Sequence, residues 1–316
     1  GSFRGPAEIP KRERLSRRIG ARTEIPMFDT ILYGLTIGAI LYLFSIGLSI
    51  TFGTMHIINF AHGMIYAIGV YLFISLLPLL WGSFPLSLVA AVAAMLPLAY
   101  LVERFVIRRL YGDGIDYAII ATYAILLIGT DLIKLVWGSG PKPVSDPIGI
   151  PIQIFGTTVQ TYRVVVFLCA VAVFVALRVF FSRHVIGKIV VAALKDRDGV
   201  RSLGLDVNKY FSIVFVIGSG LAVMGGVLYA PITVAEPYMG FHVLLLAFAV
   251  VIVGGMGNLT GTFFSALGLG QVIALTGRFY PAGADTMVFV VMTFVLLKDP
   301  IVELLRRLVG KHGIYR

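Results

Sequence analysis

Long apolar runs separated by short polar connections dominate this chain. A helix needs about 20 mainly apolar residues to cross a bilayer. Runs of that kind cover residues 29–52, 57–77, 84–102, 117–137, 163–182, 211–231, 243–276 and 285–302. The run at 243–276 is too long for one span, and four glycines within 254–261 interrupt it, so we expect two short or broken helices there, at 243–257 and 260–276. The pattern predicts an all-α polytopic membrane protein with about eight transmembrane segments, including broken or re-entrant helices.

The composition supports this prediction and excludes several classes of protein. Of 316 residues, 58% are hydrophobic and 13% are charged, whereas a soluble domain carries about 25% charged residues. This balance excludes a disordered chain, a nucleic-acid-binding domain and most soluble enzymes. The net charge of +10 comes largely from three basic clusters, at residues 4–22, 183–209 and 298–316.

Basic residues also predict the orientation, because cytoplasmic connections are enriched in Lys and Arg. Segments 103–116, 183–210 and the C-terminus are basic and should be cytoplasmic, while 138–162 and 232–242 should lie outside. Residue 28 then lies outside, which puts the seven basic residues before it on the wrong side. Either an early segment is re-entrant, or residues 1–26 are an extension or linker before a natural start at Met27. We favour the second interpretation, which leaves residues 27–316 as the transmembrane domain.

The first polar motif lies after the first apolar run, where Asn59 and His62 precede Gly63. Asn59 and His62 are three residues apart, so a helix would place both on one face. Burying an unpaired imidazole or amide in hydrocarbon costs several kcal/mol. The two side chains therefore either face a solute path at a helix break or form a structural pair with a neighbouring helix.

The loop 183–210 is the longest predicted cytoplasmic connection, and it has mixed charge. A short amphipathic helix ended by Gly204 fits its pattern. Such a helix could dock into a groove on a partner, and a plain solvated basic loop is the alternative. The residues of the predicted docking helix and its ends are Lys195, Asp196, Arg197, Asp198, Gly199, Val200, Arg201, Leu203 and Gly204.

A third motif contains Gly254, Gly255, Gly257 and Asn258 within an apolar run. Glycines at this density disfavour a continuous helix at membrane depth. Irregular backbone is tolerated there only where protein or a cavity surrounds it. We therefore predict a helix break on or near a solute path.

Together these motifs resemble the LivH-type permeases of branched-chain amino acid ABC transporters. The residues Gly47-Leu48 to Gly53 with Asn59-Phe60-Ala61-His62-Gly63 match the amino-terminal signature of that family, and Val253 to Gly261 match its carboxy-terminal signature. Asp198-Gly199-Val200, followed three residues later by Gly204, stands where such permeases carry Glu-Ala-Ala and a later Gly. The resemblance covers about residues 27–300.

The resemblance implies an ABC importer permease fold and one subunit of a larger transporter in a bacterial inner membrane. Its implied partners are a second, LivM-like permease, two cytoplasmic ATP-binding subunits and a periplasmic solute-binding protein. The implied solute is a branched-chain or other hydrophobic amino acid, moved by alternating access, with urea, amides or aromatic carboxylates as alternatives in the same family. The sequence has no Gly-xxxx-Gly-Lys-Ser/Thr motif, so we expect the partners to use the ATP and this chain to bind no cofactor or metal.

Two other classes of function stay open from the residues alone. An ion-coupled secondary transporter could use Asp131, Lys134, Glu236 or His62, but no carboxylate lies between Asp29 and Glu103. An intramembrane enzyme would need an acid–base or metal constellation, which the scattered histidines do not provide. We expect Asp131 and Lys134 to form a structural ion pair.

Overall fold

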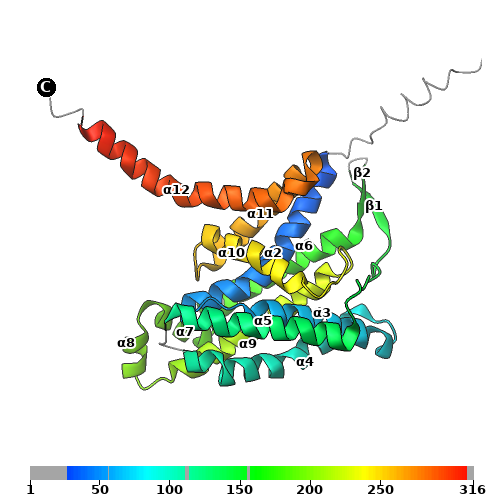
Figure 1. Ribbon diagram of the computed structural model, residues 1–316, viewed down its shortest axis with the longest axis horizontal. Helices are drawn as coiled ribbons and strands as arrows, with labels where there is room; N and C mark the ends of the chain where they lie inside the picture. Colours follow the sequence, from blue (N-terminus) through cyan, green and yellow to red (C-terminus); the bar gives the residue numbers. More distant parts are fainter. Residues whose placement is uncertain (1–26, 56, 111–113, 155–156, 312–316) are drawn as a thin grey trace, which may run out of the picture.

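The computed structural model describes residues 27–55, 57–110, 114–154 and 157–311, and in them the chain forms a helical bundle (Figure 1). The long helices are α2 (Met27–Met55), α3 (Ala61–Leu79), α4 (Phe84–Phe105), α5 (Ile115–Trp137), α6 (Thr161–Arg183), α9 (Val207–Tyr229), α11 (Leu259–Phe279) and α12 (Ala284–Lys311). The shorter elements are η1 (Ile107–Leu110), β1 (Pro151–Ile154), β2 (Thr157–Gln160), α7 (Val185–Lys195), α8 (Arg197–Ser202), α10 (Met239–Gly254) and η2 (Pro281–Gly283).

The prediction of eight spans is confirmed, since eight helices among the described residues are long and apolar enough to cross a membrane. The 243–276 run is divided at its glycines, as expected, into α10 with 16 residues and α11 with 21. The second piece is thus a full-length helix and not a short one. A small antiparallel hairpin, β1–β2, lies in the connection between α5 and α6, where Ile152 pairs with Val159.

The basic connections lie at one end of the bundle, here called the basic end. Arg108 after α4 donates a hydrogen bond to the Ser212 hydroxyl at the start of α9. Arg197 of α8 donates to Asn208 Oδ1 of α9 at 3.0 Å. At the opposite end, here called the outer end, Lys142 and Ala235 pair through their backbones. The segments 138–162 and 232–242, both predicted to lie outside, therefore lie at the same end of the bundle.

The start of α2 also lies at the outer end. There Asp29 pairs with Arg163 at the start of α6, and Thr30 contacts Arg278 at the end of α11. This placement agrees with the prediction that residue 28 lies opposite the basic segments. Residues 1–26, which we expect to be an extension, are outside the described residues.

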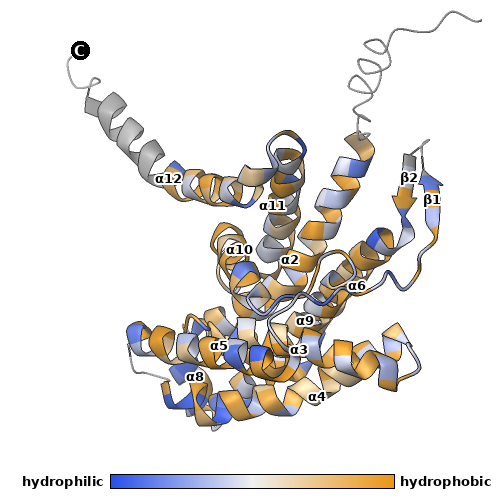
Figure 2. Cartoon of the chain, turned by 45° about the vertical axis from the view of Figure 1, so that its right-hand side comes forward, coloured by the Kyte–Doolittle hydropathy of each residue, from blue (hydrophilic) through white to orange (hydrophobic). Residues whose placement is uncertain are grey.

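Helix α2 runs through the middle of the bundle (Figure 1) and contacts α6, α7, α9, α10 and α11. In its most apolar window 83% of the residues are buried, against 6% in the segment Pro281–Lys298 that includes the first half of α12. Peripheral helices instead expose large apolar side chains, such as Ile120 and Leu135 of α5. Figure 2 shows hydrophobic residues along much of the peripheral helices α4 and α5. Because lipid is as apolar as these side chains, exposure of this kind is favourable in a bilayer.

Glycines allow the close approach of α2 to its neighbours. A Cβ atom on Gly47 would lie 2.5 Å from the carbonyl oxygen of Gly218 in α9, and one on Gly38 would lie 2.7 Å from Cα of Leu267 in α11. Small residues let backbones approach where no hydrophobic force draws helices together. The glycines of α2 therefore allow tight packing at these crossings.

Candidate functional site

The third motif forms the predicted break between α10 and α11. Gly255 and Gly257 have φ angles of 87° and 76°, in the left-handed region that favours glycine. Asn258 caps α11, since its Oδ1 accepts a hydrogen bond from the Gly261 amide at 2.9 Å. Gly254 ends α10 and packs on Gly261, where an added Cβ would lie 2.6 Å from the Gly261 carbonyl carbon.

The break is held by hydrogen bonds to the half of α2 that lies toward the basic end of the bundle. The Gly257 amide donates to the Ser49 carbonyl oxygen at 3.1 Å and lies 3.2 Å from the Ser49 hydroxyl. The Thr262 hydroxyl is 2.9 Å from the same Ser49 oxygen. The Gly257 amide lies between two helices and thus donates to a buried acceptor on α2. This hydrogen bond removes the main cost of irregular backbone at membrane depth. A movement of α2 at Ser49 would therefore be transmitted directly to the break.

The prediction that Asn59 and His62 share a helical face is wrong. Helix α3 begins at Ala61, so Asn59 lies in the preceding connection. The Phe60 amide donates to the Thr122 hydroxyl of α5 at 3.1 Å, which holds this connection against α5. The Thr122 hydroxyl here accepts the hydrogen bond that the Phe60 amide would otherwise donate within a helix.

His62 lies in the interior of the bundle, against α2. Its ring is completely buried, with Nε2 3.1 Å from the Phe44 carbonyl oxygen and the ring 4.9 Å from that of Phe44. A Cβ on Gly47 would lie 2.7 Å from the imidazole Cε1. The imidazole therefore fills the space beside the α2–α9 crossing.

Asn59 lies differently, with its side chain lining a small apolar cavity of about 110 Å³ beside Phe52 and Met256. The residue is 2% exposed, and neither amide atom has a hydrogen-bond partner among the described residues. Gly63 packs on α10, where an added Cβ would lie 2.7 Å from the Gly240 carbonyl oxygen. The first and third motifs thus meet around this cavity.

The predicted docking helix at 195–204 corresponds to α8, and α7 precedes it in the same loop. Residues 185–204 are here called the docking segment. Asp196 separates α7 from α8 and caps α8 by accepting a hydrogen bond from the Gly199 amide at 2.8 Å. Gly204 ends the segment with a φ of 78°, as its predicted helix-ending role requires. The two helices are separated by one residue, Asp196, whose backbone is extended. An interruption this short does not show in the sequence pattern, which indicates only one helix.

One face of this segment packs on the bundle and the other is free. Val200 is buried, and the Arg197 guanidinium lies over the Phe211 ring of α9 at 5.3 Å. Asp198 and Arg201 are exposed and form a weak ion pair of 3.8 Å, and Leu203 is 76% exposed. Lys195 is also exposed, at the end of α7. The amphipathic character predicted for this loop is confirmed.

The docking segment touches the helix break through one side chain. Leu194 of α7 lines a hollow of about 310 Å³ with Gly53 and Gly257. Its Cδ2 lies 3.3 Å from the Cβ position of Gly53 and 4.0 Å from that of Gly257. The end of α2, the break and the docking segment therefore meet at Leu194, which the sequence analysis did not single out as a contact.

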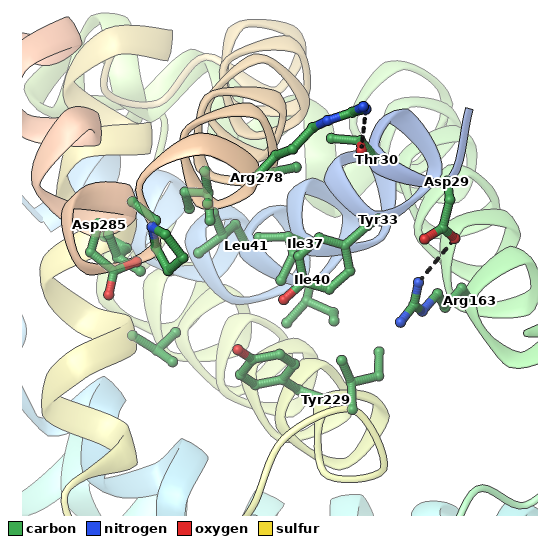
Figure 3. Close-up of a pocket in the computed structure, with 18 residues that line it drawn as sticks. Asp29, Thr30, Tyr33, Ile37, Ile40, Leu41, Arg163, Tyr229, Arg278 and Asp285 are labelled. Carbon is green, nitrogen blue, oxygen red and sulfur yellow. Dashed lines mark hydrogen bonds and ion pairs between the residues drawn. The ribbon is translucent and has the colours of Figure 1, made fainter. Parts of the chain in front are cut away.

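A larger cavity of about 610 Å³ opens at the outer end, and the sequence analysis missed it (Figure 3). Its polar lining includes Asp29, Arg163, Arg278 and Asp285, from four different helices. Aliphatic side chains line the rest, among them Ile37, Ile40, Leu41, Val243, Leu246 and Ile273. No local motif marks such a site, because residues up to 256 positions apart contribute to it. We refer to it as the outer cavity.

The ion pair expected between Asp131 and Lys134 is present near the outer end of α5. Lys134 Nζ is 3.0 Å from Asp131 Oδ1 and 2.8 Å from the Tyr238 hydroxyl. The Asp131 side chain is 75% exposed. The pair lies outside the outer cavity and the helix break, in agreement with the structural role expected for it.

Known proteins resemble this chain over most of its length. The family described as "Branched-chain amino acid transport system / permease component" matches residues 30–297. The permease protein BraD of a high-affinity branched-chain amino acid transport system in Pseudomonas aeruginosa is 28% identical over 284 residues, which cover 84% of this chain and 92% of BraD.

Two further relatives carry the name LivH. The high-affinity branched-chain amino acid permease LivH of Escherichia coli K12 is 26% identical, with 84% of this chain and 92% of LivH covered. A probable LivH of Methanocaldococcus jannaschii is 26% identical, with 88% and 90% covered. Among solved structures, PsaBC from Streptococcus pneumoniae in complex with Fab aligns with a TM-score of 0.49 at 13% identity, covering 90% of this chain and 94% of that one.

Proposed function

Because this chain belongs to the family of branched-chain amino acid transport permease components, we propose that it is the membrane-spanning subunit of an ABC importer for branched-chain and other hydrophobic amino acids. The family match over residues 30–297 carries the proposal. The protein is a multi-pass transport component and not an enzyme. We place it in a bacterial inner membrane, with the basic end in the cytoplasm.

The energy for transport would come from two cytoplasmic ATP-binding subunits. The chain itself has no phosphate-binding Gly-xxxx-Gly-Lys-Ser/Thr motif. The exposed face of α7 and α8, with Asp198, Arg201 and Leu203, offers charged and apolar groups to a partner groove. A second, LivM-like permease and a periplasmic solute-binding protein would complete the transporter.

Alternating access would follow from the contacts at the basic end. Closure of the ATP-binding subunits would move α7 and α8, and Leu194 would pass this movement to Gly53 and Gly257. The break between α10 and α11 offers a place where backbone angles can change without loss of long helices. The outer ends of α10 and α11 would then shift against α2.

Uptake into proteoliposomes tests this function. We expect the complete complex to accumulate labelled leucine only when ATP, the ATP-binding subunits and the binding protein are present. Uptake by this chain alone under an ion gradient would contradict the ABC assignment. Uptake of urea or benzoate without uptake of leucine, isoleucine or valine would contradict the proposed solute.

Reversing charge on the exposed face of α8 should uncouple the transporter. We expect Asp198→Lys and Arg201→Glu each to lower ATP-driven uptake at least about tenfold, which corresponds to about 1.4 kcal/mol of lost docking energy. Neither side chain packs on the bundle, so folding should be unchanged.

The matched control is Arg104→Glu, which reverses an exposed charge at the same end of the bundle. We expect the control to keep wild-type uptake. The measurement is leucine uptake together with the ATPase rate. Equal uptake and equal ATPase rates in all three variants would show that the docking surface lies elsewhere.

A further inference from the structure

We propose that a groove between α4 and α9 at the basic end binds one phospholipid with an ethanolamine headgroup. The groove, here called the inner groove, has a volume of about 490 Å³, within the range of roughly 300–1,000 Å³ that small-molecule sites occupy. The two helices that form it lie side by side (Figure 1). The site is independent of the transported solute, because it needs only the multi-pass fold and a basic end at the membrane surface.

The lining of the inner groove changes from charged to apolar along α9. Asp206 caps the helix at its basic end, Lys209 follows almost one turn later, and Ile213, Val216 and Ile217 continue the line toward the centre of the bundle. Spacings of three and four residues place side chains on one face of a helix. At 1.5 Å per residue this line is about 16 Å long. It therefore passes through the polar layer of one leaflet, about 5–8 Å thick, into the hydrocarbon.

A second cation is held in the middle of this line. Arg108 of η1 donates a hydrogen bond to the hydroxyl of Ser212, which lies three residues beyond Lys209 in α9. The same guanidinium donates to both oxygens of the buried Glu103 carboxylate, at 3.2 and 3.1 Å, which fixes its position. Tyr100 of α4 lines the opposite side, and tyrosine is enriched at the level of lipid headgroups.

The charges of the groove leave one anion and one cation for a ligand. Glu103 balances the charge of Arg108. Asp206 and Lys209 are exposed, and neither forms an ion pair among the described residues. Asp206 Oδ1 accepts hydrogen bonds from the amides of Asn208 and Lys209 at 3.1 and 3.4 Å, which leaves Oδ2 for another donor. The negative group thus lies outermost, and the positive groups lie closer to the apolar wall.

A phospholipid with an ethanolamine headgroup carries the complementary groups in the same order. Its ammonium group would donate to Asp206, its phosphate would accept hydrogen bonds from Lys209 and Arg108, and an acyl chain would pack on Ile213 and Val216. An oxygen and two carbons separate its phosphorus from its nitrogen. Side chains three residues apart on a helix have Cβ atoms about 5–6 Å apart, so one headgroup reaches both Asp206 and Lys209. An anionic headgroup would bring a negative charge beside Asp206 without a cation to balance it.

The test uses the complete complex, purified in detergent and stripped of lipid. Native mass spectrometry counts bound lipid while phosphatidylethanolamine is titrated. The comparison lipids are phosphatidylglycerol, which lacks the cation, and phosphatidylcholine, whose methylated nitrogen has no N–H donor. Soluble glycerophosphoethanolamine carries the same headgroup without acyl chains. We expect phosphatidylethanolamine to bind at concentrations at least about tenfold lower than any of the other three.

Two variants locate the binding in the inner groove. Asp206→Asn removes the charge but keeps an oxygen for the helix cap, because Asn and Asp cap helices about equally well. It should weaken the binding of phosphatidylethanolamine about tenfold without weakening that of phosphatidylglycerol. Lys209→Gln should weaken the binding of both lipids about tenfold. The controls Asp198→Asn and Arg183→Gln remove exposed charges at the same end, outside the groove, and should change nothing.

Three results would overturn the inference. Equal affinity for the three lipids would indicate an ordinary, unselective lipid shell. Selective binding that both groove variants leave unchanged would place the lipid elsewhere on the complex. Glycerophosphoethanolamine that binds as tightly as the whole lipid would show that the apolar wall takes no part. Leucine uptake by the same preparation is measured separately, so each of these results leaves the proposed function intact.

Discussion

The variant Gly47→Leu is expected to yield almost no folded protein. Gly47 lies where α2 crosses α9, and a Cβ there would meet the Gly218 carbonyl oxygen at 2.5 Å and the carbonyl carbon at 2.8 Å. Both are backbone atoms of a buried helix, so they cannot rotate away as a side-chain tip could. Overpacking of a core costs about 1–3 kcal/mol even where side chains can adjust. A leucine against a fixed backbone should cost more and separate the two helices.

The chain offers a matched control in Gly268→Leu. Gly268 lies within α11, and nothing comes within 4 Å of its Cβ position. Replacing a helical glycine there should be neutral or stabilising, because glycine is about 1 kcal/mol less favourable than alanine in a helix. The measurement is the yield of monodisperse protein in detergent and its thermal midpoint. A Gly47 variant as stable as the Gly268 variant would show that α2 and α9 do not cross in this way.

The second large effect is expected from Leu194→Ala, which should separate ATP hydrolysis from transport. Leu194 is the side chain that joins the docking segment to Gly53 and Gly257. Its removal leaves the docking face of α8 unchanged, because Asp198, Arg201 and Leu203 point away from the bundle. The ATP-binding subunits should therefore still bind and hydrolyse ATP, while leucine uptake falls at least about tenfold.

The control for this variant is Val185→Ala at the other end of α7, where the side chain is 67% exposed. We expect it to keep both activities. The readout is the number of leucine molecules moved per ATP, measured in proteoliposomes. A normal ratio in Leu194→Ala would show that movement reaches the break by another route, such as the Ser49–Gly257 hydrogen bond.

The sequence predicts the spans well because their signal is strong and local. A run of about 20 apolar residues and a cluster of glycines each act through residues next to one another in the chain. The structure confirms the eight spans and the break at Gly255 and Gly257 that these signals predict. Residue spacing failed at Asn59, where the Thr122 hydroxyl of a distant helix holds the Phe60 amide outside α3. A partner 62 residues away leaves no trace in local periodicity.

The outer cavity illustrates the same limit for a site. Two of its charged residues have an ordinary local explanation, since Asp285 lies in the first turn of α12 and Arg278 in the last turn of α11, where such charges favour the helix dipole. Only the packing of α11 along α2 brings Arg278 to Thr30 and opens the space beside it. The docking segment was easier to predict, because its charge pattern and terminal glycine are contiguous.

The central position of α2 also has a consequence for how the protein is made. The ribosome delivers α2 first among the described helices, yet its partner α11 emerges more than 200 residues later. Until then the face of α2 around Gly38, which packs on the α11 backbone in the finished bundle, is covered only by lipid or assembly factors. The bundle therefore closes late in biosynthesis, and a chain interrupted before Leu259 would hold an unfinished centre that cellular quality control can recognise.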